Sequence, residues 1–289
     1  MSRLQSLMIF LVMPCLLLSL VGCTDHHVTS SVKSSDGTLI AYESQGTGSP
    51  ALVFVHGWSC DRSYWSEQTE FFAADHQVVL IDLAGHGDSG RGRNDWTIPA
   101  YAQDIKAVMA DLGLDQVILI GHSMAGSVVA EAGALVPDQV VGLIGIDTLH
   151  DIEEHYTEEQ ITGFSASMEA NFPVAAQAFV RSMFLADADS ALVESIASDM
   201  SSAPPAIAIS SIRQYLGWSI IGALDSYQPK VRCINAGLWP SNIEHGLAHC
   251  SEFTVRTMDG AGHFLFMEKP NEFNSILAEE IATLTTSAP

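Results

Sequence analysis

The segment GHSMAG at residues 121–126 places a serine between small residues, directly after the apolar run QVILI. A serine on a sharp turn between a strand and a helix can attack a carbonyl carbon, because the turn holds its hydroxyl clear of the backbone. Such a turn needs small neighbours two positions away. Gly121 and Ala125 meet this need, although the strict pattern has glycine at 125, and Gly126 gives the helix room to approach the strand. We therefore predict that Ser123 is a nucleophile.

A serine hydroxyl is a weak nucleophile unless a base removes its proton. His263 follows the last predicted strand in the segment GAGH, whose glycines would let the imidazole swing toward the serine. His263 is therefore the predicted base. The oxyanion of the intermediate needs hydrogen-bond donors as well. The backbone N–H of Met124, after the serine, and that of Trp58, after the run ALVFV, are the predicted pair.

Two acidic residues are candidates for orienting His263. Asp147 ends the apolar run VVGLIGI, and a side chain at the carboxyl end of a parallel strand is rigidly placed. Glu244 lies in a polar segment beyond Pro240 and has a longer side chain, so it stays the alternative. We predict Asp147. It could instead cap the first helix of the segment that follows it, with Thr148.

These residues require strands that end along one edge of a sheet. Short apolar segments alternate with helical patterns, which indicates a parallel sheet with crossover helices. The runs ALVFV, VVLID and QVILI lack polar alternation, as expected for strands covered on both faces. The predicted strands cover residues 39–43, 51–55, 78–82, 116–121, 140–146, 231–236 and 253–258, and two clear helices cover 99–112, begun near Thr97 and ended by Gly113, and 271–284.

The alternation breaks between residues 148 and 226. This stretch has several amphipathic helical patterns, punctuated by prolines, and lacks strand-like runs. It is predicted to be a helical cap inserted into a core formed by residues 34–147 and 227–289. Six large apolar residues of this region either line an acyl pocket or form the cap's own core: Met168, Phe172, Phe179, Met183, Phe184 and Trp218.

The motifs HGWSCDRSYW, DLAGHGDSG, GHSMAG and GAGHFLFMEKP, in this order and spacing, resemble those of the α/β-hydrolase superfamily. The resemblance extends from about Ser34 to Leu284. It implies an α/β fold with an eight-stranded, mostly parallel sheet, flanking helices and a cap inserted after strand six. It also implies serine hydrolysis through an acyl-enzyme. Many relatives carry the acid after strand seven in a G-x-x-D pattern, but this chain reads INAGLWPSN there, without aspartate.

The function expected from these residues is hydrolysis of a small neutral or apolar ester, without a cofactor. The same residues could serve a C–C bond hydrolase, a lactonase, a thioesterase or an aminopeptidase. A low-turnover ligand-binding module of the same fold is the alternative outside enzymology.

The first residues are predicted to be a targeting signal. Arg3 precedes an apolar run that ends in the segment LVGC, which resembles the lipobox of a bacterial lipoprotein. Residues 1–22 would be removed and Cys23 acylated, with 23–33 as a linker. The protein would then be exported and held on a cell-envelope membrane, on its periplasmic or surface side. A plain signal peptide and an uncleaved anchor are the alternatives.

The chain has a formal net charge of −22, and residues 147–200 hold eleven acids against one base, Arg181. Such a surface repels phosphates, so we expect neither nucleic acid nor an anionic substrate. A disulfide between Cys233 and Cys250 stays open. The pair His245 and His249 has the i, i+4 spacing of metal ligands, but we expect no metal site.

Overall fold

The computed structural model describes residues 28–94 and 96–286. The expected signal peptide and the expected lipidation site, Cys23, lie outside these residues. Within them, no helix combines the length and the hydropathy needed to cross a membrane.

The core of the described chain is an eight-stranded sheet with the order β1-β2-β4-β3-β5-β6-β7-β8. β2 pairs antiparallel with both β1 and β4, and the remaining neighbours are parallel. This is the mostly parallel sheet that was predicted. The strands are β1 Val28–Lys33, β2 Leu39–Gln45, β3 Ala51–Val55, β4 Val78–Ile81, β5 Val117–His122, β6 Val140–Ile146, β7 Lys230–Ala236 and β8 Glu252–Met258.

The central strands are apolar because both of their faces are covered. Every residue of β3, β4 and β5 is buried, which explains why these runs lack polar alternation. The carboxyl ends of β5 and β6 lie side by side, with His122 opposite Ile146. The residues that follow these two strands, Ser123 and Asp147, therefore leave the sheet at the same edge.

The strand β1 corrects the second part, residues 28–33, of the linker predicted over residues 23–33. Its sequence VTSSVK pairs along its whole length with β2, from Val28 opposite Ser44 to Lys33 opposite Leu39. A tight turn closes this hairpin, with a hydrogen bond of 2.8 Å from the N–H of Ser34 to the carbonyl of Thr38. A polar strand at the sheet edge has little apolar signal, so its sequence looked like a linker.

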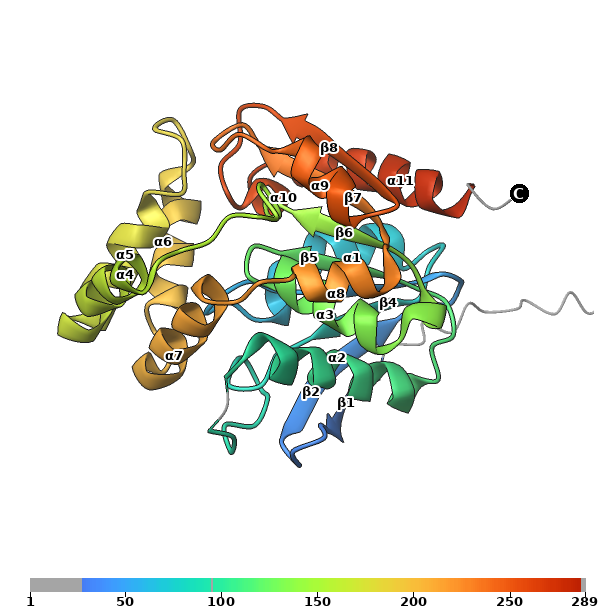
Figure 1. Ribbon diagram of the computed structural model, residues 1–289, viewed down its shortest axis with the longest axis horizontal. Helices are drawn as coiled ribbons and strands as arrows, with labels where there is room; N and C mark the ends of the chain where they lie inside the picture. The colour runs from blue at the N-terminus through green and yellow to red at the C-terminus, as the bar shows by residue number, and fades with distance from the viewer. Residues whose placement is uncertain (1–27, 95, 287–289) are drawn as a thin grey trace, which may run out of the picture.

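Helices cover both faces of the sheet (Figure 1). α2, α3 and α8 pack side by side on one face, and α1 and α11 pack together on the other. As predicted, α2 begins after Thr97, which caps the N–H of Ala100, and ends at Gly113, whose φ is +62°. The core helices are α1 Ser66–Phe72, α2 Ile98–Leu112, α3 Ala125–Leu135, α8 Ile221–Tyr227, α9 Ile243–His249, α10 Leu265–Glu268 and α11 Pro270–Thr285, with short 3₁₀ turns at Arg62–Trp65 and Pro137–Gln139.

Four helices between β6 and β7 form the cap. They gather on the left in Figure 1, where α4 packs against α5 and α7, and α5 against α6. α8 packs instead against α3, so the cap helices end at Leu216, earlier than the predicted boundary at residue 226. The cap helices are α4 Glu158–Ala170, α5 Phe172–Arg181, α6 Ser190–Met200 and α7 Pro205–Leu216.

Candidate active site

The turn between β5 and α3 holds Ser123 in a left-handed backbone conformation, with a φ of +54°. A non-glycine residue in this region is strained, which is the property of a turn that exposes a nucleophile. A Cβ at Gly121 would collide with the carbonyl of Ala125. A Cβ at Gly126 would lie 2.5 Å from the side chain of Thr148, whose Oγ1 donates to the carbonyl of Ser123 at 2.7 Å. Gly126 thus makes room for Thr148, the second residue after β6.

The structure brings Asp147 to His263. The Nδ1 of His263 lies 2.6 Å from the Oδ2 of Asp147, and the Asp147 side chain is fully buried. The Oδ1 of the same carboxylate accepts the N–H of Ala236 at 2.8 Å. Glu244, the alternative, lies exposed on α9 and makes no hydrogen bond or ion pair with His263 within the described structure. Asp147 does not cap the first cap helix, because Thr157 caps α4.

Burial acts on both members of this pair. It raises the pKa of Asp147 to about 6, against the opposing effects of His150 and the Ala236 N–H. It lowers the pKa of His263 to about 4, because the imidazolium is desolvated. The resting pair at neutral pH is therefore a carboxylate and a neutral imidazole with its proton on Nδ1. That tautomer leaves Nε2 of His263 free to accept a proton.

The backbone N–H groups of Trp58 and Met124 are candidate donors to an oxyanion. Both residues are buried, and neither N–H has an acceptor within the described chain. Gly57 brings the two segments together, because a Cβ there would lie 3.0 Å from Nδ1 of His122 and 3.2 Å from the Cβ of Ser123. A larger residue at position 57 would push the loop with Trp58 away from the serine.

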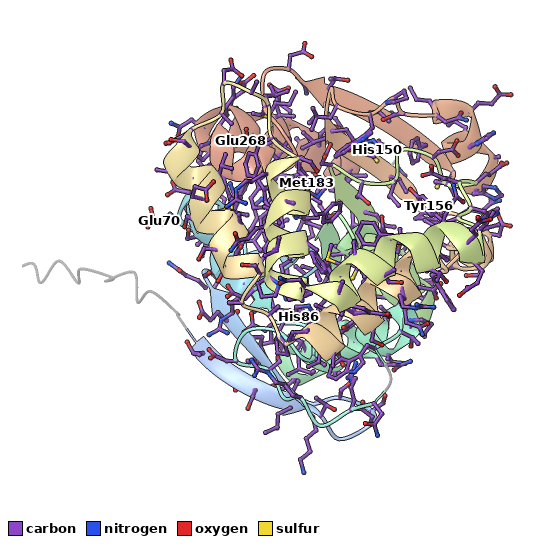
Figure 2. All side chains as sticks on the ribbon, turned by 90° about the vertical axis from the view of Figure 1, so that its left-hand side faces the viewer. Glu70, His86, His150, Tyr156, Met183 and Glu268 are labelled. Carbon is purple, nitrogen blue, oxygen red and sulfur yellow. The ribbon has the colours of Figure 1, made fainter. Side chains whose placement is uncertain are left out.

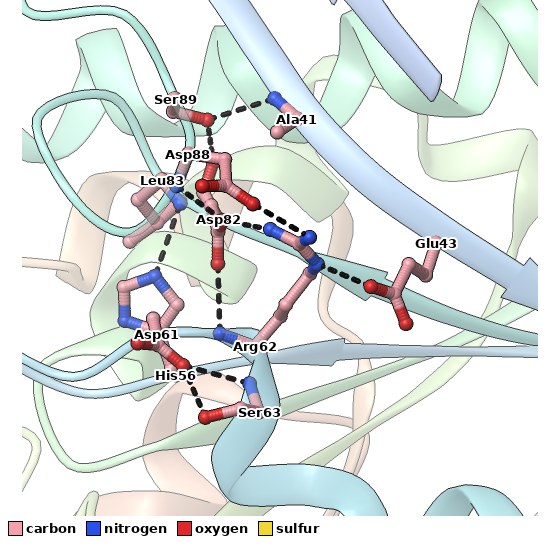
Figure 3. A network of polar contacts seen from close by, with 10 residues as sticks. All are labelled: Ala41, Glu43, His56, Asp61, Arg62, Ser63, Asp82, Leu83, Asp88 and Ser89. Atoms are coloured by element: carbon pink, nitrogen blue, oxygen red, sulfur yellow. Dashed lines mark hydrogen bonds and ion pairs between the residues drawn. The ribbon is translucent and has the colours of Figure 1, made fainter. Parts of the chain in front are cut away.

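A network of polar contacts holds the loop that carries Trp58 (Figure 3). Asp82, after β4, accepts the N–H groups of Arg62 and Asp88, each at 2.8 Å, and pairs with the Arg62 guanidinium. Arg62 also pairs with Glu43 of β2 at 2.8 Å. The Nε2 of His56 accepts the N–H of the residue after Asp82 at 3.0 Å. The turn after β4 and the loop after β3 are therefore one unit.

The same network settles what His56 can do. Its Nδ1 donates to the carbonyl of Gly57 at 2.8 Å while its Nε2 accepts a backbone N–H, so both ring nitrogens are used. Burial lowers the pKa of His56 to about 4. This neutral ring is a structural support for the loop.

His122, which precedes the serine, contributes in a way that the sequence did not reveal. Its ring is buried, and burial lowers its pKa well below the ordinary value. A neutral ring can donate from Nε2, which lies 3.0 Å from the carbonyl of His263. His122 therefore fixes the backbone of the residue that holds the base.

Ser123, His263 and Asp147 border one cavity of about 1020 Å³ between the core and the cap. Trp58 and Met124 border it too. Figure 2, which looks onto the cap, labels three further lining residues, Met183, His150 and Tyr156. Of the six apolar cap residues singled out in the sequence, Phe179, Met183 and Trp218 line this cavity. The others pack elsewhere: Met168 and Phe172 in the hydrophobic core, and Phe184 on the ring of Phe264.

The cap touches the site through its own backbone. The indole Nε1–H of Trp58 donates to the carbonyl of Ala208 on α7 at 2.7 Å, and the N–H of His263 donates to the carbonyl of Met183 at 2.9 Å. A Cβ at Gly262 would lie 2.6 Å from that Met183 carbonyl. Gly262 thus serves the close approach of the cap, where the sequence had suggested a flexible hinge for the imidazole.

Sequence comparison shows the family to which this chain belongs. Residues 52–276 match the model of the alpha/beta hydrolase family. The chain belongs to this family. The protein is accordingly a hydrolase, and its fold is that of the family.

The identities to individual curated relatives are low. The hydrolase is 26% identical over 261 residues to a dihydrolipoyllysine-residue acetyltransferase component of an acetoin cleaving system from Cupriavidus necator, covering 85% of this chain and 67% of that protein. It is 26% identical over 185 residues to the karrikin insensitive 2 receptor IA of Petunia hybrida, covering 61% and 68%. A solved thermophilic esterase from Thermogutta terrifontis has a TM-score of 0.76 at 22% identity, over 90% of this chain and 99% of that one. This last likeness shows the fold.

The histidine pair on α9 is engaged by carboxylates. His245 Nδ1 lies 2.7 Å from Asp151, and His249 Nδ1 lies 2.7 Å from Asp225. Glu153 lies within 3.7 Å of both rings. The contacts with Asp151 and Glu153 tie α9 of the hydrolase to the segment that leads into the cap, and the contact with Asp225 ties it to α8. No cluster with the makings of a metal site occurs among the described residues.

The three described cysteines, Cys60, Cys233 and Cys250, are free and buried. Cys233 and Cys250 thus do not form the disulfide that the sequence left open. Cys60 borders the cavity, but burial raises the pKa of its thiol well above the ordinary value, so it is not a ready thiolate.

Proposed function

We propose that this hydrolase cleaves a small neutral or apolar carboxylic ester through an acyl-enzyme on Ser123. The observation that carries the proposal is the 2.6 Å contact between His263 and Asp147 on the cavity that Ser123 also borders. A nucleophile on a strained turn, a base and a buried carboxylate are the groups that acyl transfer needs.

In the first step, Ser123 attacks the ester carbonyl while Nε2 of His263 takes its proton. The imidazolium that forms lies against Asp147, whose negative charge stabilises it. The N–H groups of Trp58 and Met124 receive the developing oxyanion, and they cost no reorganisation because they are already held without another acceptor. The imidazolium then gives its proton to the departing alcohol.

The second step releases the acid. Water replaces the alcohol, and the neutral His263 takes a proton from it as it attacks the acyl-enzyme. The same donors receive the second oxyanion. The His263 imidazolium then returns that proton to Oγ of Ser123 as the bond between Oγ and the acyl carbon breaks, and the acid product departs.

The cavity lining supports a neutral or apolar substrate. Most of the cap side chains that line it are apolar, among them Phe164, Phe179 and Leu216. The lining that the structure describes contains no lysine or arginine, whereas Asp151 and Glu154 belong to it. A substrate with a carboxylate or phosphate would meet like charge without a cation to pair with it.

The test uses p-nitrophenyl esters of increasing acyl length. Ser123→Ala should lose on the order of 10⁵–10⁶ in kcat. The matched control is Ser275→Ala on the exposed side of α11, which should keep wild-type kinetics. Retention of most activity by Ser123→Ala would refute the proposed nucleophile.

A fluorophosphonate probe distinguishes the enzyme from a binding module. The similarity to a receptor is the observation that makes this second candidate worth testing. We expect the probe to label wild type and Ser275→Ala but not Ser123→Ala. A wild-type protein that neither reacts with the probe nor turns over any ester of the series would instead be a ligand-binding member of the family.

We further propose that the mature hydrolase is exported and anchored to a cell-envelope membrane by lipid on Cys23. The proposal rests on the segment LVGC after an apolar run. It places the substrate in the compartment outside the cytoplasm.

A further inference from the structure

A second histidine faces the carboxylate of Asp147. His150 follows it by three residues and borders the same cavity, in the upper half of Figure 2. Its Nε2 lies 3.6 Å from the Oδ1 of Asp147, while His263 contacts the Oδ2 at 2.6 Å. Within the described structure, Nε2 of His150 is buried and has no hydrogen-bond partner. The carboxylate therefore lies between two imidazoles.

The side chain of Asn235, in β7, and the carboxylate of Asp147 together favour one position for the proton of His150. Its Oδ1 accepts the N–H of Thr148 and its Nδ2 donates to the carbonyl of Thr148, both at 3.2 Å, so the orientation of the amide is fixed. The same Nδ2 lies 3.1 Å from Nδ1 of His150. The Oγ of Ser241 lies 3.1 Å from the same Nδ2 and 3.4 Å from Nδ1, and a hydroxyl can donate or accept. Because the amide nitrogen only donates and the carboxylate of Asp147 only accepts, the neutral ring that suits both neighbours accepts at Nδ1 and has its proton on Nε2. That N–H is on the side of Asp147.

The backbone holds this arrangement in place. Asp147 and Leu149 both have positive φ values, +44° and +54°, which makes the turn after β6 tight. The carbonyl of His150 accepts the N–H of Asn242 at 2.6 Å, and its ring centre lies 5.7 Å from that of Trp239. His150 is therefore fixed from the segment after β7 as well as from its own.

We propose that His150 is a positioning residue for the Asp147–His263 pair. The Nε2–H of His150 keeps Asp147 ionised and keeps the Oδ2 of Asp147 directed at His263. The role rests on the proposed serine mechanism. Apart from His263, the Ala236 N–H is the one hydrogen-bond donor that the described structure gives this carboxylate. The positive end of the His150 dipole, 3.6 Å from Oδ1, thus adds to the Ala236 N–H in compensating the burial of Asp147.

The direction of the effect follows from the proton count of the pair. The active pair holds one proton, and uptake of a second inactivates it, whichever partner receives it. A positive dipole beside Asp147 opposes that uptake. The other titratable groups that face the carboxylate are His122 from β5, Tyr215 from α7 and Glu268 from α10. These groups are unchanged when His150 is replaced, so the shift reports on His150.

The test compares the pH dependence of kcat/KM in His150→Phe and His150→Gln. Phenylalanine removes the donor, so the acidic limb should move to higher pH by about half a unit or more, with the plateau above it nearly unchanged. Glutamine places an amide N–H near the position of Nε2. Burial lowers the pKa of His150 and so favours the neutral ring, whose N–H the amide replaces, and the glutamine variant should follow the wild-type profile.

The matched control is His155→Phe, in the exposed segment before α4, which should not move the limb. A second measurement does not depend on turnover: the NMR resonance of the His263 Nδ1 proton should titrate at higher pH in His150→Phe and as in wild type in His150→Gln. A wild-type profile in His150→Phe, or equal shifts in both variants, would overturn the role of His150. Activity that survives Ser123→Ala would instead overturn the mechanism on which it rests.

Discussion

Replacing Asp147 by asparagine should leave the fold intact but prevent His263 from acting as a base. The N–H of Ala236 donates to one oxygen of Asp147 at 2.8 Å, and asparagine must keep its carbonyl oxygen there to accept it. Its NH₂ group then takes the place of the Oδ2 that contacts His263. An NH₂ group donates, so Nδ1 of His263 must become the acceptor. The ring proton moves to Nε2, where it blocks proton transfer from the serine.

The size of the loss follows from that exchange. The variant keeps the oxyanion donors and the cavity, and loses both the correct tautomer and the charge that stabilises the imidazolium. We expect kcat to fall by on the order of 10³–10⁴, or about 4–5 kcal/mol of transition-state stabilisation. The loss should appear in kcat far more than in KM.

The folding stability of Asp147→Asn, unlike its activity, should equal or exceed that of wild type. The folded pKa of Asp147, about 6, stands above its model value of 3.8, so the folded state binds the proton more tightly than the unfolded chain. Ionisation therefore lowers folding stability as pH rises between these two values, and the penalty is complete at neutral pH. Asparagine carries no charge, so the variant should melt at or above the wild-type temperature.

The assay is steady-state hydrolysis of p-nitrophenyl butyrate at neutral pH, with thermal melts by circular dichroism. Glu244→Gln is the control, because Glu244 is exposed and should keep kcat close to wild type. If Asp147→Asn keeps kcat within tenfold of wild type while melting lower, Asp147 is a structural residue and the reasoning fails. A loss in Glu244→Gln alone would transfer the role to that residue.

Three further predictions concern the surroundings of the site. Gly57→Ala should lower kcat about tenfold or more in folded protein, since the new Cβ would lie 3.2 Å from that of the proposed nucleophile; unchanged kcat would contradict the assigned oxyanion loop. Arg62→Met should cost about 3 kcal/mol of unfolding free energy in urea titrations, because it leaves the fully buried carboxylate of Asp82 without its cation; a cost below about 1 kcal/mol would show that the backbone donors suffice. Cys23→Ser should release the hydrolase from membranes on fractionation, and full retention would favour an uncleaved anchor.

The sequence was most informative where one residue type is demanded by local geometry. The turn between β5 and α3 needs small residues around Ser123, and buried parallel strands need unbroken apolar runs. Both were therefore predictable from short segments. The edge strand β1 was not, because VTSSVK has neither an apolar run nor an alternating face. Its pairing with β2 is what makes it a strand.

The residues that the sequence analysis missed are those whose roles depend on contacts with residues far away in the sequence. His150 lies in a polar segment with nothing local to mark it, and its environment comes from Asn235 on another strand. His122 lies inside the segment GHSMAG, but its contact with the backbone of His263 joins residues that are 141 positions apart in the sequence. The choice between Asp147 and Glu244 likewise depended on which of the two lies beside His263, which the order of residues could not decide.

The way the cap meets the site has a consequence for how such an enzyme diversifies. Within the described structure, the hydrogen bonds that Trp58 and His263 donate to the cap end on main-chain carbonyls, those of Ala208 and Met183. Every residue type has that carbonyl, so mutation of the cap side chains leaves these two anchor points in place. Drift in α4–α7 can therefore reshape the walls that a substrate touches while the reacting groups keep their positions. Selection can explore new substrates in the cap without first giving up turnover.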